Sequence, residues 1–119
     1  MKRRTFLSTL GAGLATAPIA LANGSPPKRL AIITTEWRYH SHAWHMGTRF
    51  LVGYPRQGSW HQPPLEGVSA YVDQFPENDL ARRRSEEFGF PIYDTIAQAL
   101  RCGGQDLAVD AVLIIGEHG

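Results

Sequence analysis

The chain has 119 residues, with 12 Lys or Arg, 11 Asp or Glu and a single cysteine, Cys102. Lys2, Arg3 and Arg4 account for three of the basic residues, so residues 23–119 hold nine basic and eleven acidic side chains, a net charge of −2. This composition excludes an internal disulfide, gives no basic surface for nucleic acid, and suffices for one small domain with a modest core.

Residues 1–22 predict an export signal. Arg3 and Arg4 precede an uncharged run from Phe6 to Ala22, which ends in the small-x-small pattern that signal peptidases cleave. The run is too short and too rich in Gly, Ser and Thr for a stable membrane span, which needs roughly 20 strongly apolar residues. Adjacent arginines followed by Thr-Phe-Leu resemble the twin-arginine (Tat) signal, and the alternative is an ordinary secretory signal. The resemblance implies that the Tat export machinery carries the folded protein to the periplasm or out of the cell.

The first half of the remaining chain predicts one strand and one helix. Residues 23–29 contain Gly-Ser-Pro-Pro and predict a linker. Residues 30–35 form an apolar, β-branched run that is typical of a buried parallel strand. Helical spacing of apolar residues over 41–52, with Ser41 as a candidate N-cap, predicts a helix. Residues 53–67 contain three prolines and predict a loop.

The second half alternates between short strands and helices. Glycines mark the expected helix ends, and Asn78 or Asp79, and then Asp94 or Thr95, are the candidate N-caps. The predicted elements are strands at 68–72, 91–93 and 109–115 and helices at 80–88 and 96–102.

The resulting order, β-α-β-α-β-α-β, predicts an α/β domain over residues 30–119 with a parallel sheet. The strand at 109–115 is so apolar that we expect both of its faces to be buried. No helix follows it to provide that cover. We therefore expect this domain to be the incomplete N-terminal part of a longer protein, or to have its cover supplied by a partner chain.

Three segments carry a resemblance to a known family: residues 70–73, 85–96 and 109–115. They are similar to the second strand, the helix and third strand after it, and the fourth strand of the N-terminal Rossmann-like domain of the glucose–fructose oxidoreductase and inositol dehydrogenase (Gfo/Idh/MocA) family. The resemblance implies a Rossmann-like sheet and an oxidoreductase-type cofactor, NAD or NADP.

The sequence departs from that family in the turn after the first strand. The family has G-x-G-x-x-G there, which lets the backbone approach the pyrophosphate, whereas residues 35–42 contain no glycine. Bulky side chains on this turn are expected to take the space of the pyrophosphate. The family's second domain, which carries its catalytic lysine, has no counterpart in these residues. We therefore expect an exported relative that is not catalytic alone.

In an open parallel sheet, ligands bind beyond the carboxyl ends of the strands. Glu36, Arg38 and His40 follow the first predicted strand, and Asp73 follows the second. Asp73 is the candidate ribose ligand, with Arg38 and Glu36 as further cofactor contacts; the alternative for Asp73 is a turn-forming role. Glu117 and His118 follow the last strand at the same edge.

His40, His42 and His45 form the pattern H-x-H-x-x-H. Imidazoles at this density are candidate ligands for zinc or another divalent metal, and the alternative is that they decorate an exposed turn. Two further functions follow from these patterns. One is a metal-dependent, hydrolase-like protein that uses the three histidines, and the other is a noncatalytic Rossmann-like binding module.

Overall fold

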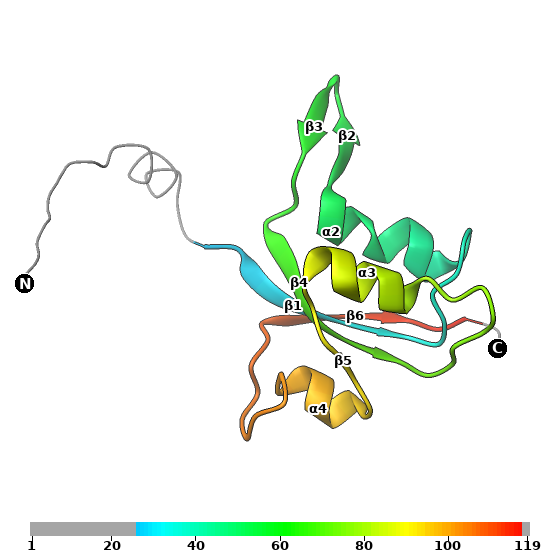
Figure 1. Ribbon diagram of the computed structural model, residues 1–119. Helices are drawn as coiled ribbons and strands as arrows, with labels where there is room; N and C mark the ends of the chain where they lie inside the picture. Colours follow the sequence, from blue (N-terminus) through cyan, green and yellow to red (C-terminus); the bar gives the residue numbers. More distant parts are fainter. Residues whose placement is uncertain (1–25, 118–119) are drawn as a thin grey trace, which may run out of the picture.

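The structure is a computed structural model that describes residues 26–117. Four parallel strands form its main sheet in the order β5-β4-β1-β6 (Figure 1). The predicted α/β class with a parallel sheet is confirmed, and each predicted strand overlaps an observed one. The predicted export signal lies outside the described residues. The strands of this sheet are β1 (Lys28–Thr34), β4 (Leu65–Val72), β5 (Ile92–Tyr93) and β6 (Ala111–Ile115).

Strand β1 lies in the middle of the sheet. It pairs with β4 over its whole length and with β6 from Leu30 to Thr34. Its side chains from Leu30 to Ile33 are buried on both faces, which explains why this segment is apolar without alternation. Four consecutive apolar residues were therefore a dependable strand signal.

Helices cover both faces of the sheet (Figure 1). Leu30 and Ile32 of β1 belong to the core on one face, where the π-helix η2 (Ala43–Gly47), α2 (Arg49–Val52) and α3 (Ala81–Phe88) pack. Ala31 and Ile33 belong to a smaller core on the other face, under α4 (Ile96–Leu100). The alternation of β1 side chains thus divides the apolar residues into two layers.

The helix predicted over residues 41–52 forms as two short pieces. A π-helical turn, η2, precedes the single α-helical turn α2, with Thr48 between them. Ser41 is buried, and its hydroxyl accepts a hydrogen bond from the backbone N–H of Trp44 at 3.2 Å, the contact expected of a capping serine.

Side-chain caps begin the two remaining helices. The Asp79 carboxylate accepts the backbone N–H groups of Ala81 (3.1 Å) and Arg82 (3.2 Å) at the start of α3. The Thr95 hydroxyl accepts the N–H of Gln98 at 3.1 Å in α4. Both residues were among the predicted caps.

Most of the loop predicted over residues 53–67 is a β-hairpin, and residues 65–67 belong to β4. The hairpin is the feature that the sequence did not predict. Its strands are β2 (Tyr54–Arg56) and β3 (Ser59–His61), and it projects from the body of the domain (Figure 1). The two residues between the strands, Gln57 and Gly58, have φ angles of 49° and 80°. Positive φ at both positions is the signature of a type I′ turn, which matches the twist of a hairpin.

Strand β6 is covered on one face only within the described residues. Ile115 is buried in the larger core, but Ile114 on the opposite face is 75% exposed and Val112 is 41% exposed. Helix α4, which covers that face, packs against β1, β4 and β5. Within the described residues, this face of β6 therefore lacks the cover that its apolar sequence predicts. Among residues 26–117, no helix has the length and apolarity to cross a membrane.

Candidate functional site at the carboxyl edge of the sheet

The carboxyl ends of β1, β4 and β6 are joined by backbone hydrogen bonds that continue past the strands. Thr35 N–H donates to the Ile115 carbonyl at 3.2 Å, and Asp73 N–H donates to the Thr34 carbonyl at 3.0 Å. The N–H of Gln74 donates to the Thr35 carbonyl at 2.7 Å. Backbone hydrogen bonds therefore hold these segments together at the edge where an open α/β sheet binds ligands.

A pocket of about 260 Å³ opens at this edge, on the face that α4 covers. It is smaller than the roughly 300–1,000 Å³ typical of sites for drug-sized ligands, so it suits a small molecule. We call it the edge pocket, and its lining residues are Ile33, Thr34, Thr35, Tyr71, Asp73, Ile96, Ile114, Ile115 and Gly116.

Asp73 supplies the carboxylate of the edge pocket. It is exposed, and its Oδ1 accepts a hydrogen bond from the Tyr71 hydroxyl at 2.9 Å. That hydrogen bond, with smaller contributions from desolvation and from the charge of Asp73, raises the pKa of Tyr71 above 10.0. Tyr71 therefore stays a neutral donor that orients the carboxylate. An ionised carboxylate offers about four acceptor positions, so Asp73 can accept further hydroxyl groups.

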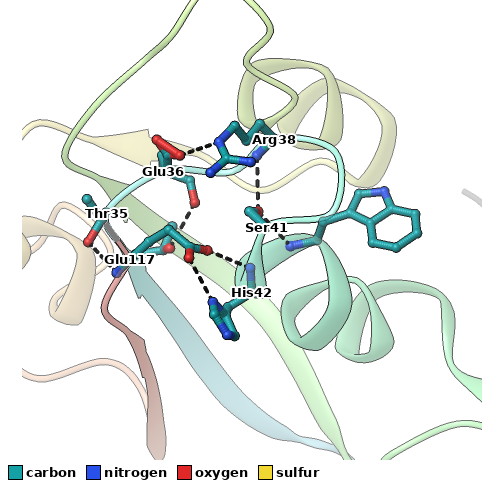
Figure 2. Close-up of polar contacts among 8 residues, drawn as sticks. Thr35, Glu36, Arg38, Ser41, His42 and Glu117 are labelled. Atoms are coloured by element: carbon teal, nitrogen blue, oxygen red, sulfur yellow. Dashed lines mark hydrogen bonds and ion pairs between the residues drawn. The ribbon is translucent and has the colours of Figure 1, made fainter. Parts of the chain in front are cut away.

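Glu36 and Arg38, the other predicted cofactor contacts, bind each other. Glu36 is only 5% exposed, and its Oε1 forms an ion pair with Nε of Arg38 (Figure 2). Neither side chain lines the edge pocket. The pair neutralises a buried carboxylate in the turn after β1, which gives both residues a structural role there.

Trp37 lies between them and is completely buried. Its ring stacks on Phe90 with 6.2 Å between centroids, and its carbonyl accepts the backbone N–H of Leu80 at 2.7 Å. We expected bulky side chains of this turn to fill the space of a pyrophosphate. For Trp37 that mechanism is wrong, because the indole points into the core beneath the turn.

His42 forms a bidentate contact with Glu117, which follows β6 (Figure 2). The Glu117 carboxylate accepts the backbone N–H of His42 at 2.6 Å and lies 2.8 Å from Nδ1 of its ring. The N–H of Glu117 donates to the Thr35 hydroxyl at 3.0 Å. The backbone and side-chain hydrogen bonds from His42 lower the pKa of Glu117 below 4.5, so Glu117 is an anion at neutral pH.

The three histidines are divided between two environments. His42 contacts Glu117, whereas the rings of His40 and His45 stack with 6.0 Å between their centroids. Tyr39 stacks on His40, and Trp44 packs edge-on against both histidines of that pair. Throughout residues 26–117, no three His, Cys, Asp or Glu side chains are gathered as a metal site requires.

Asp73 and Glu117 lie at the edge of the sheet that the sequence predicts, but the contact between Glu117 and His42 was not predicted. These two residues are 75 positions apart, and only the β1–β6 pairing brings them together. His118, predicted at the same edge, lies outside the described residues.

Fold and site together define an α/β protein with a candidate small-molecule site at the carboxyl edge of a parallel sheet. Comparison with family models, with curated proteins and with solved structures finds no match to this chain.

Proposed function

We propose that this protein is an exported, noncatalytic binding module with a Rossmann-like sheet of the nucleotide-binding type. The observed order β5-β4-β1-β6 corresponds to 3-2-1-4 in order of appearance, which matches the first four of the six strands in the Rossmann order 3-2-1-4-5-6. This order, together with the segments at 70–73, 85–96 and 109–115, supports placing the chain beside the Gfo/Idh/MocA oxidoreductases.

The observation that carries the proposal is the position of Asp73 in the edge pocket. A carboxylate at the end of the second strand of such a sheet can accept both hydroxyl groups of a ribose. The pocket has apolar walls from Ile33, Ile96 and Ile114 and a polar rim at Thr35 and Asp73. Its proposed ligand is a small molecule with adjacent hydroxyl groups, such as the ribose of a nucleoside.

Two features argue against a complete dinucleotide in the usual mode. Residues 35–42 contain no glycine to bring the backbone close to a pyrophosphate. The backbone N–H of His42, the residue directly before η2, already donates to the Glu117 carboxylate. The cofactor of an oxidoreductase therefore fits this site less well than a nucleoside does.

Calorimetric titration with adenosine, supported by thermal unfolding, tests the proposal. A ligand that binds only the folded state raises the melting temperature by mass action, so adenosine should raise it and NAD should raise it no further. Asp73→Asn should weaken adenosine binding about tenfold or more, because a charge-assisted hydrogen-bond acceptor is lost.

Asp106→Asn is the matched control, because Asp106 is exposed and lies outside the edge pocket. It should bind adenosine as the unmodified protein does. Adenosine binding that is absent, or equal in the two variants, would overturn the proposal. NAD binding much tighter than adenosine binding would restore a dehydrogenase-type function.

A further inference from the structure

A second pocket, of about 340 Å³, lies where the helices of the larger core meet the base of the hairpin (Figure 1). We call it the hairpin-base pocket. Its walls come from η2, α2, the start of the hairpin and α3, and it shares no residue with the edge pocket. Its volume is within the roughly 300–1,000 Å³ range that is typical of small-molecule sites.

The chain around this pocket is basic, although residues 23–119 carry a net charge of −2. Residues 37–65 contain three arginines and four histidines but no Asp or Glu. Arg49 of this segment lines the pocket together with Arg84 of α3, and no carboxylate of the described residues does so. A small cavity lined by charges of one sign attracts a ligand of the opposite sign, so this pocket favours an anion.

Neighbouring side chains hold both guanidinium groups in place. That of Arg49 lies over the ring of Tyr54, 5.4 Å from its centroid. The side chain of Arg84 is 20% exposed, and its Nη1 donates to the Glu87 carboxylate. A guanidinium has five N–H donors, and its planar fork matches the two oxygens of a carboxylate. Both arginines can therefore donate to a further acceptor without being reoriented.

Two residues of the pocket also hold buried polar atoms without a hydrogen-bond partner among residues 26–117. These atoms are Nε of Arg84 and the hydroxyl oxygen of Thr48. A buried donor that lacks an acceptor destabilises a folded protein, and a ligand that supplies the acceptor removes that penalty. An oxygen-bearing anion meets this need better than an apolar ligand does.

We propose that the hairpin-base pocket binds a small aromatic carboxylic acid. Its carboxylate accepts hydrogen bonds from Arg49, Arg84 and Thr48, and its ring packs against Trp44 and Tyr54, the large aromatic side chains of the pocket. A neutral ligand of the same shape would leave the arginines unmatched. Because the two pockets share no residue, this inference does not rest on the proposed function.

Benzoate is the probe, with benzamide as its neutral isostere and acetate as a carboxylate without a ring. In calorimetric titrations of the protein, benzoate should bind saturably. Benzamide and acetate should each bind at least about tenfold more weakly, because one lacks the charge and the other lacks the ring. Benzamide or acetate binding as tight as benzoate binding would overturn the proposal.

Arg49→Gln should weaken benzoate binding about tenfold, because it removes a charged donor. Arg56→Gln is the matched control, because Arg56 is an exposed hairpin arginine outside this pocket and its replacement changes the net charge equally. Thr48→Val keeps the shape of the side chain but removes the hydroxyl. It should weaken benzoate binding about threefold without lowering the melting temperature of the free protein.

Equal effects of Arg49→Gln and Arg56→Gln would overturn the proposal, because they would reflect net charge alone. Benzoate binding that survives both Arg49→Gln and Thr48→Val unchanged would also overturn it. Asp73→Asn should bind benzoate normally, and a loss of binding in that variant would place benzoate in the edge pocket instead. Benzoate binding without adenosine binding would refute the proposed function and leave the carboxylate site standing.

Discussion

Trp37 is among the largest side chains that residues 26–117 bury completely, and it lies in the turn between the central strand and η2. Its indole fills the core between the sheet and the helices that cover it. The neighbouring Tyr39 is 61% exposed. Two aromatic residues of one turn therefore differ in burial, with Trp37 in the core and Tyr39 at the surface, and the sequence alone does not distinguish them. Which one points inward depends on Phe90, more than fifty positions away, whose ring stacks on Trp37.

The indole N–H of Trp37 has no hydrogen-bond partner within the described residues. Trp37→Ala should lower the free energy of unfolding by about 3–5 kcal/mol, because it leaves a large cavity. Trp37→Phe should cost about 1.5 kcal/mol or less, because it keeps most of the packing and removes an unsatisfied buried donor. Urea unfolding followed by circular dichroism measures both. If Trp37→Ala and Trp37→Phe lower the free energy of unfolding equally, the indole N–H has a hydrogen-bond partner in solution.

Elements whose signal is local were predicted best. The central strand and the capped helices α3 and α4 each contain their own signal, in an apolar run or a capping side chain. The hairpin was missed because three-residue strands are too short to show an alternating pattern, and Pro55 indicates a loop. Its only local signal is the pair Gln57-Gly58, a two-residue turn that ends in glycine.

The hairpin can be tested by substitutions at its base, Gly53, and in its turn, Gln57 and Gly58. A Cβ at Gly58 would meet nothing within 4 Å, so Gly58→Ala should cost about 1–2 kcal/mol from the left-handed backbone alone. A Cβ at Gly53 would lie 2.6 Å from the His61 carbonyl oxygen, so Gly53→Ala should cost more. Gln57→Asn should stabilise the protein by a few tenths of a kcal/mol, because asparagine tolerates positive φ better.

Urea unfolding gives the free energies of these variants. Gly53→Ala and Gly58→Ala with the same cost would contradict the close contact at Gly53. A destabilising Gln57→Asn would contradict the type I′ turn.

At the scale of the whole molecule, the sequence also predicts where the protein works. Arg3 and Arg4 precede the uncharged run, and they are the residues that resemble a Tat signal. Replacing both with lysine keeps the positive charge but removes the twin-arginine pattern. The doubly substituted precursor should stay in the cytoplasm, as immunoblots of cell fractions would show. Normal export of the variant would indicate an ordinary secretory signal.

The pairing of β1 with β6 also sets a time scale for synthesis. The backbone N–H of Arg29 reaches the carboxylate of Asp110 across 81 residues of chain. At about 5–20 residues per second, a ribosome takes roughly 4–16 seconds to make that stretch. Throughout that interval one edge of an apolar strand has no partner, and such an edge is prone to aggregation. The nascent chain therefore offers a binding site to chaperones for several seconds, and β6 removes that site when it pairs.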